Sequence, residues 1–285
     1  MCPMLGKVRI AQVLARAGLH LGSTTVGRML KAGVPGSEAG AVAVAQDVDL
    51  AVTTRVVTAK CPDHVWHVDL TVVPTAPGFW VPWLPFTRPQ VWPFCWWVAV
   101  VVDHFTRRLQ GFSVFPAEPS ATEVCAFLDR AIDRVGTRPK HIITDQGGQF
   151  IGDDFREWCK ERRVRPRKGA VGKQGSIAIV ERLIRSLKRE CTRRIRIPLG
   201  LGAMCREVSL YAMWYNEFRP HQALDGMTPE ERYDGGQAHP RAGPVEPRRR
   251  WPLDDETMRV KRIHLVVKFL EGRRHLPIVE LKRAA

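Results

Sequence analysis

Three acidic residues at wide spacing are the side chains of this sequence best suited to chemistry. Asp69 lies within the apolar, β-rich stretch 64–73, Asp145 directly follows the apolar run 141–144, and Glu181 lies in a helical pattern. Converging carboxylates repel one another unless a cation neutralises them, and hard divalent ions such as Mg²⁺ prefer oxygen ligands. We therefore predict that the three acids form a divalent-metal site for phosphoryl transfer.

Positive charge is concentrated around the third acid. The chain has a net charge of +15, and residues 160–196 contain fourteen Lys and Arg but only three acids, one of which is Glu181. Such an excess indicates an anionic partner, either nucleic acid or an acidic membrane surface. Because most of it surrounds one acid of the predicted site, DNA is the favoured partner.

The helix that carries Glu181 has a basic face of its own. Arg185 and Lys188 lie four and seven residues after Glu181, and this spacing places them on the same side of a helix. Lys173 and Gln174 lie in a glycine-containing loop just before it, where they could approach phosphates or a terminal base. These contacts would position DNA without specifying its sequence.

The elements that must position these side chains alternate between strands and helices, an order typical of an α/β fold with a mixed sheet. Helices are expected at 8–17, 23–30, 118–135, 153–162, 176–195 and 203–218, and strands at 64–73, 94–103, 108–115, 141–144 and 164–167. Thr228 to Glu231 reads as a capping box with proline at the first helical position.

Composition divides the chain into five segments. The predicted division is a helix-turn-helix-like element at 1–33, a linker at 34–60, a catalytic core at 61–234, a linker at 235–250 and a β-hairpin module at 251–285. For the first segment, a helical hairpin that packs on the core is an equally weighted alternative. Within the core, residues 74–93 form a proline- and tryptophan-rich insertion, and its tryptophans are expected at a hydrophobic rim rather than stacked on bases.

Cysteine usage and hydropathy indicate the cellular compartment. Seven scattered cysteines without a CxxC pair are typical of a reduced, cytosolic protein. The apolar run at 94–102 is too short to cross a bilayer, and no signal peptide is recognisable. We expect a bacterial cytoplasmic protein that uses neither a membrane nor a small-molecule cofactor.

Several stretches together resemble a known family. They are HVWHVDLT (64–71), VVDHFTRRLQGF (101–112), TDQGGQF (144–150), the E-x-x-x-x-x-x-K helix (181–188) and YNEFRPHQALDGMTPEERY (215–233). In order and spacing, over roughly residues 60–235, they resemble the integrase-type catalytic core of insertion-sequence transposases and retroviral integrases.

The resemblance implies a ribonuclease-H-like fold, a mixed five-stranded sheet flanked by helices. It also implies a D,D(35)E triad, onto whose positions Asp69, Asp145 and Glu181 fall with thirty-five residues between the last two. The implied cofactor is two Mg²⁺ or Mn²⁺ ions, and the implied assembly is a homo-oligomer on DNA. The DNA contacts predicted from the basic face and the family motifs are Lys173, Gln174, Arg185, Lys188, Arg189 and Arg219.

The implied reaction is DNA strand cleavage by water followed by attack of the freed 3′-hydroxyl on target DNA. Two alternatives remain: a truncated, non-catalytic relic that binds DNA or inhibits an intact transposase, and a ribonuclease-H-type nuclease. The presence of all three acids favours the transposase over the relic. The long basic helix after Glu181 and the YNEFRPH block (215–221) argue against the nuclease.

Overall fold

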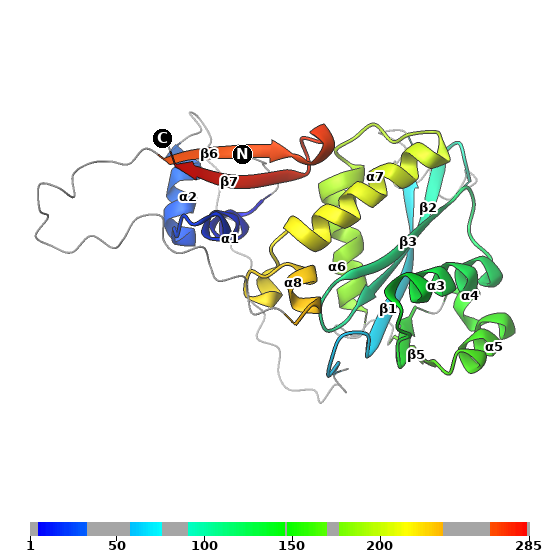
Figure 1. The fold of residues 1–285 in the computed structure, drawn as a ribbon. Coiled ribbons are helices and arrows are strands. Elements are labelled where there is room, and N and C mark those ends of the chain that lie inside the picture. The colour runs from blue at the N-terminus through cyan, green and yellow to red at the C-terminus, as the bar shows by residue number, and fades with distance from the viewer. Residues whose placement is uncertain are drawn as a thin grey trace, which may run out of the picture.

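The computed structural model describes residues 5–32, 58–75, 91–145, 147–169, 177–235 and 263–283. At its centre lies a five-stranded sheet in the order β3-β2-β1-β4-β5 (Figure 1). The strands are β1 (Val65–Pro74), β2 (Cys95–Asp103), β3 (Leu109–Phe115), β4 (His141–Thr144) and β5 (Arg165–Lys168). Most of the predicted insertion at 74–93 and most of the two predicted linkers fall outside the described residues.

The sheet is mixed. β1 pairs antiparallel with β2 and β2 antiparallel with β3, whereas β4 runs parallel to β1 and β5 parallel to β4. A short turn joins the antiparallel strands β2 and β3, whereas parallel strands need a longer crossover connection. This arrangement confirms the predicted α/β class and the ribonuclease-H-like topology that the resemblance implied.

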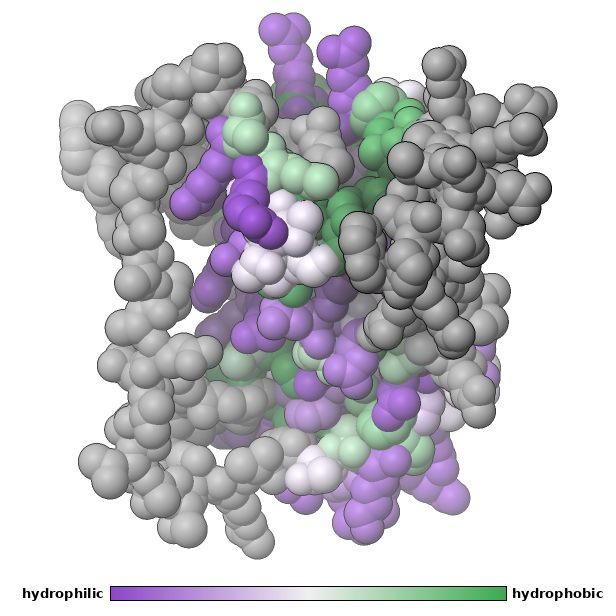
Figure 2. Space-filling model, turned by 90° about the vertical axis from the view of Figure 1, so that its left-hand side faces the viewer, coloured by the Kyte–Doolittle hydropathy of each residue, from purple (hydrophilic) through white to green (hydrophobic). Residues whose placement is uncertain are grey.

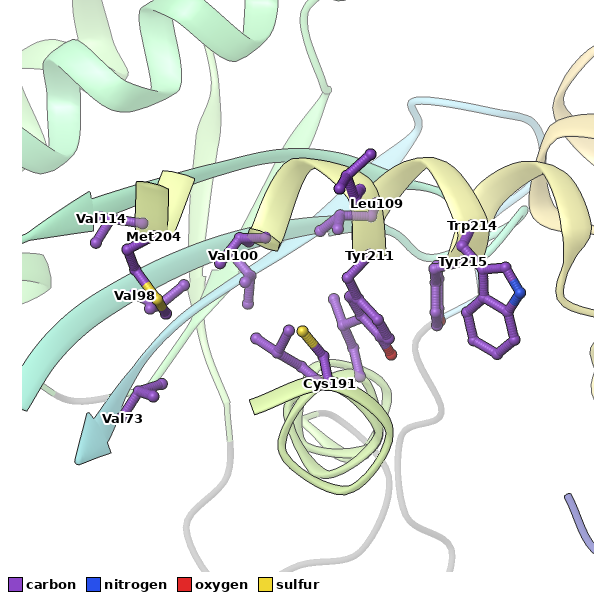
Figure 3. Close-up of a cluster of buried hydrophobic side chains, with 14 of the residues drawn as sticks. Val73, Val98, Val100, Leu109, Val114, Cys191, Met204, Tyr211, Trp214 and Tyr215 are labelled. Carbon is purple, nitrogen blue, oxygen red and sulfur yellow. The ribbon is translucent and has the colours of Figure 1, made fainter. Parts of the chain in front are cut away.

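Helices cover both faces of the sheet. They are α3 (Ala121–Val135), α4 (Gly148–Ile151), α5 (Asp153–Glu161), α6 (Ala178–Leu187), α7 (Leu201–Met213) and α8 (Pro229–Tyr233). Alternate residues of β2 belong to different cores because successive side chains of a strand point to opposite faces. Val98 and Val100 pack in the core formed with α6 and α7 (Figure 3), whereas Ala99 and Val101 pack against α3 and α5.

Local sequence signals account for the boundaries of several helices. Ser120 caps α3 by accepting from the Glu123 backbone N–H, and the Glu123 side chain accepts from the Ser120 N–H in return. Gly136 ends the same helix in the left-handed region, with φ of 75°, where a glycine has no Cβ to clash. Thr228 forms the predicted capping box of α8 with Glu231.

Two helices end in π-helical turns that the sequence pattern does not predict. α6 continues as Lys188–Thr192 and α7 as Trp214–Phe218. In the first turn Glu190, Cys191 and Thr192 are all buried, and three consecutive residues cannot share one face of a regular α-helix. The turn therefore brings Glu190 into the interior.

Two adjacent glycines, residues that favour a turn, follow β4. Gly147 is instead the N-cap of the short helix α4, which begins at Gly148, and Gly152 is the N-cap of α5. Phe150 explains the extra helix, because it is buried and its ring packs edge-on against Phe155 of α5. A hydrophobic contact thus overrides the local turn preference of the two glycines.

The terminal segments pack together at one end of the molecule (Figure 1). Figure 2 turns this end toward the viewer and shows both hydrophilic and hydrophobic side chains on its surface. Helices α1 (Lys7–Ala17) and α2 (Ser23–Ala32) share a small core to which β7 of the β6–β7 hairpin contributes. The hairpin strands are β6 (Ile263–Phe269) and β7 (Pro277–Arg283). Ion pairs from Arg9 to Glu190 and from Arg16 to Glu231 tie α1 to the central domain.

Candidate active site

The pairing of β1 with β4 aligns the first two acids. Val65 lies opposite His141 and His67 opposite Ile143, so the same offset continued by two residues places Asp69 opposite Asp145. Opposed residues of parallel strands have side chains on the same face of the sheet. Asp69 also lies opposite Val100 of β2, which belongs to the core beneath α6 and α7. Both carboxylates therefore face the α6 side.

Helix α6 carries the third acid above that face. Its buried residues Val180, Leu183 and Leu187 belong to the core shared with β2, and the helix contacts β1 and β2. Glu181 lies in the first turn and is exposed at the flank of this apolar stripe. The stripe fixes the rotation of α6 about its axis and hence the side on which Glu181 emerges.

The three acids interact electrostatically. Burial raises the pKa of Asp69 to about 7, and the carboxylates of Asp145 and Glu181 raise it as well. Two groups act in the opposite direction: the Leu70 backbone N–H, which donates to Asp69 Oδ1 at 2.7 Å, and the Lys188 ammonium. The fold thus brings the predicted residues Asp69, Asp145, Glu181 and Lys188 into one neighbourhood.

The acids do not meet at one point. Over the described ranges, no three His, Cys, Asp or Glu side chains lie close enough together to hold a metal ion. Asp69 accepts from the backbone amide of Leu70 and Asp145 from that of Gly147 at 3.1 Å, while Glu181 is exposed. The loop just before α6, residues 170–176, lies outside the described residues.

The donor set nevertheless has the chemistry of a divalent-cation site. No ion pair between described residues involves Asp69, Asp145 or Glu181, so their mutual repulsion is uncompensated by arginine. Asp69, a largely buried carboxylate with a raised pKa beside two other carboxylates, is a group whose ionised form a hard cation would stabilise. The residues present therefore fit Mg²⁺ or Mn²⁺.

The predicted DNA contacts fall into different environments. Lys188 is half-buried beside Asp69, and burial followed by the charge of Arg193 lowers its pKa. Arg185 and Arg189 are exposed. The predicted contacts Lys173 and Gln174 lie outside the described residues.

Arg219 is in a different environment, because it is only 4% exposed. Its Nε and Nη2 donate to the two carboxylate oxygens of Glu190 at 2.7 and 2.9 Å, and Arg9 Nη1 donates to the same carboxylate at 2.7 Å. Burial, and next the Arg219 charge, lower the pKa of His221 well below its usual value, so the neutral ring accepts from Arg219 Nη1 at 3.1 Å. A DNA contact by Arg219 stays a prediction.

Two acids, Asp63 and Asp103, have structural roles. Asp103 accepts from the N–H and Oγ1 of Thr106, both at 2.7 Å, and so fixes the β2–β3 turn. Asp63 was not predicted: it accepts from Trp66, Gln110 and Tyr233 and thereby joins β1, β3 and α8. Its sequence signal is weak, because it is one polar residue among several directly before a strand.

Trp96, which lies on β2 just after the predicted insertion, is excluded from base stacking by the structure. Trp96 is 2% exposed in the core, where its Nε1 donates to the Pro198 carbonyl at 2.8 Å. Trp92, by contrast, is 48% exposed and donates to the Leu199 carbonyl. Trp96 therefore packs the α6 and α7 side of the sheet.

Comparison with known proteins gives the class. Residues 59–174 and 162–229 each match the family described as Integrase core domain, so the matches together span most of the central domain. The chain belongs to the integrase core family of insertion-sequence transposases, which is related to the retroviral integrases. DNA transposition is the activity of this class.

Similar proteins come from bacterial insertion sequences. A putative transposase of the element IS986/IS6110 from Mycobacterium tuberculosis is 26% identical over 259 residues, covering 84% of this chain and 85% of that protein. The transposase of IS904 from Lactococcus lactis subsp. lactis is 23% identical over 178 residues, covering 62% and 64%.

Among solved structures, a simian T-cell lymphotropic virus intasome in complex with PP2A regulatory subunit B56 gamma matches with a TM-score of 0.49 and 18% identity. It covers 80% of this chain and 71% of that chain. The HTLV-2 integrase catalytic core domain in complex with magnesium matches with a TM-score of 0.43 and 19% identity, covering 60% and 96%. In the part of this chain that the structure describes, no helix is long and apolar enough to span a membrane.

Proposed function

We propose that this protein is an active transposase that cleaves DNA strands and transfers the resulting 3′-hydroxyl ends to target DNA. In the first step water attacks phosphorus and the 3′-oxygen leaves with a proton. In the second step that hydroxyl attacks a target phosphodiester, whose own 3′-oxygen leaves. The observation that carries the proposal is the alignment of Asp69 with Asp145 beneath α6, in electrostatic contact with Glu181.

The residues proposed to hold the metal are Asp69, Asp145 and Glu181. Divalent ions, two by analogy with phosphoryl-transfer enzymes, would stabilise charge on the phosphoryl oxygens and help deprotonate the attacking hydroxyl or water. Asp69 is held at mid-strand by the pairing of β1 with β2, where it lies opposite Val100. The carboxylate of Asp69 must lose its proton before it can act as a ligand, because its pKa is raised to about 7.

A strand-transfer assay tests this function. The purified chain is incubated with Mg²⁺ or Mn²⁺, a labelled duplex carrying the ends of its element, and a plasmid target. Cleavage with joining supports the proposal. Cleavage without joining indicates a nuclease, and binding without cleavage indicates the non-catalytic relic. Asp145→Asn is expected to abolish both steps, whereas Asp133→Asn, an exposed acid of α3, is the matched control.

Metal binding can be tested without activity. Mn²⁺ is expected to raise the melting temperature of the wild-type protein and of Asp133→Asn, but not that of Asp145→Asn. Equal stabilisation of all three proteins would remove Asp145 from the metal site. The number of ions follows from a titration monitored by calorimetry.

The oligomeric state and the cellular compartment follow from the same proposal. Transposition of an element joins two DNA ends, and we propose that a homo-oligomer of this chain holds them. Sedimentation with and without end-containing DNA measures the number of subunits. The bacterial sources of its relatives support action in a bacterial cytoplasm.

A further inference from the structure

A second basic site lies outside the acidic cluster. It is a cavity of 420 Å³ whose walls come from four separate segments of the chain. Arg9 comes from α1, Arg107 from the β2–β3 turn, Arg182 from α6 and Arg219 from the segment after α7. Four guanidinium groups from distant parts of the sequence therefore converge on one space.

The charges around this cavity are only partly compensated. Glu190 pairs with both Arg9 and Arg219, so one carboxylate serves two of the four guanidinium groups. No ion pair within the described residues involves Arg107 or Arg182. The cavity thus has an excess of positive charge that an anion would neutralise.

Arg107 is the clearest example of this uncompensated positive charge. Its Nη1 is buried and has no hydrogen-bond partner among the residues that the structure describes. Burial lowers the pKa of the Arg107 guanidinium, and the nearby Arg182 charge lowers it as well, although Tyr215 and Asp103 act in the opposite direction. A buried donor of a charged group without a partner costs free energy unless a ligand or water supplies an acceptor.

The cavity has a closed floor and an open rim. Arg219, Tyr215 and His221 form the floor and are each less than a tenth exposed. Arg182 and Gln222 at the rim are exposed. A ligand can therefore enter from solvent and meet donors that the fold already holds in place.

Phosphate suits this site better than a carboxylate does. The guanidinium fork donates two parallel hydrogen bonds to oxyanions, and a phosphodiester can accept from several arginines at once. Ala178 and Ile179 of the first turn of α6 also line the cavity, where the positive end of the helix dipole adds to the attraction. We propose that this cavity binds a phosphodiester group of the DNA backbone, an inference that rests on the proposed function only for the identity of the ligand.

The position of the cavity separates this phosphate from the reacting one. Arg182 and Ser186, four residues apart, form one flank of α6, whereas Glu181 and Lys188, seven residues apart, form the other. A helix with its side chains is roughly 10 Å across. The bound phosphate therefore belongs to a different nucleotide from the one cleaved, and it anchors DNA on the far side of the helix that carries Glu181.

DNA affinity at several salt concentrations tests the site. The full chain binds a labelled duplex in EDTA, so that cleavage plays no part and loss of catalysis cannot be confused with loss of the anchor. The variant Arg107→Gln/Arg182→Gln is expected to bind about tenfold more weakly at 0.1 M salt and to lose about one unit of the salt slope. Arg130→Gln/Arg156→Gln removes the same charge from exposed positions on α3 and α5 and should retain the wild-type slope.

Two results would overturn the proposal: a wild-type slope in the cavity variant, or equal losses in both double variants. Arg182→Gln alone covers the case in which the double variant unfolds, because Arg182 is exposed, and it should show a smaller loss in the same direction. Stabilisation against heating by short duplex DNA or by polyglutamate identifies the ligand class. Loss of the DNA effect in the variants supports the proposal, whereas loss of the polyglutamate effect alone assigns the cavity to a protein partner and overturns it.

Discussion

Glu181 and Glu190 lie nine residues apart on one continuous helical segment, yet their environments are opposite. Glu181 is exposed, and none of the ion pairs among described residues involves it. Glu190 has a side chain that is 5% exposed and accepts from two arginines, one of them bidentate. The same side-chain type therefore serves two purposes within three turns of helix.

The contrast distinguishes a carboxylate suited to metal binding from one that stabilises the fold. A carboxylate already neutralised by arginines has little to gain from a metal ion, whereas neighbouring carboxylates without cations bind one readily. Like Glu181, Asp69 and Asp145 take no part in an ion pair with a described residue.

The first prediction concerns Glu181. Glu181→Gln is expected to reduce strand cleavage at least about a thousandfold, about 4 kcal/mol in the barrier, because an amide is a poor ligand for a hard cation. Its stability should change by less than about 0.5 kcal/mol, since the side chain is exposed. Single-turnover cleavage and urea unfolding measure the two effects, with Glu157→Gln on α5 as an exposed control. Wild-type cleavage by the variant would exclude Glu181 as a catalytic residue.

The second prediction concerns Glu190, where we expect a large effect on stability and a smaller effect on cleavage. Glu190→Gln leaves the buried Arg219 without its counter-charge and should lower the free energy of unfolding by about 3 kcal/mol. Cleavage by the protein that remains folded should fall far less than in Glu181→Gln. Urea unfolding and cleavage at low temperature provide the comparison. A loss of stability below 0.5 kcal/mol, about that of a surface substitution, would show that the ion-pair network does not hold the fold.

The strands and their order along the chain followed from the sequence because the signals for single strands are local. The alternation of 64–73 and the apolar run 141–144 predict β1 to within a residue and β4 at His141–Thr144. Placing Asp69 and Asp145 on one face also requires the parallel pairing and register of β1 with β4, which the structure provides. The helical period of α6 likewise predicts the side from which Glu181 emerges, since Val180, Leu183 and Leu187 must face the sheet.

Features that depend on tertiary packing were not predictable in this way. The π-helical turn at Lys188–Thr192 exists because buried partners on both sides hold it, and no single-residue preference signals it. Arg9 belongs to the segment predicted as a helix-turn-helix-like element, but its partner Glu190 lies 181 residues away. One signal for Glu190 was present: it is the single acid between Glu181 and Glu207 in a strongly basic stretch.

The third prediction uses the raised pKa of Asp69, which is about 7 in the folded protein and about 4 in an unfolded chain. Between these values the folded state holds a proton that the unfolded state releases, so the metal-free protein loses stability as pH rises from 4 to 7. Asp69→Asn removes this pH-dependent loss of stability and retains an Oδ1 atom that accepts from the Leu70 backbone N–H. The variant should be more stable by on the order of 1–2 kcal/mol at pH 7.5 and nearly equal to wild type at pH 4.

Thermal unfolding in EDTA at the two pH values measures this effect, and Asp153→Asn, whose side chain is 95% exposed, is the control. Mn²⁺ should then stabilise wild type but not Asp69→Asn. A variant less stable than wild type at pH 7.5 would mean that Asp69 supports the fold rather than opposing it, and the contrast with Glu190 would disappear.

The smallest effect is expected at Lys188, which lies between the two environments: half-buried, and close enough to Asp69 to lower its pKa. Lys188→Ala should weaken DNA binding several-fold and reduce the salt slope by about one unit, as expected for one lost phosphate contact. Because a nearby positive charge is lost, the pKa of Asp69 should also rise, so the pH at which Mn²⁺ begins to bind should shift upward. Lys160→Ala, an exposed lysine of α5, is the control for the salt slope. An unchanged slope together with a shifted metal-binding pH would assign Lys188 to the acidic cluster alone and remove it from the DNA interface.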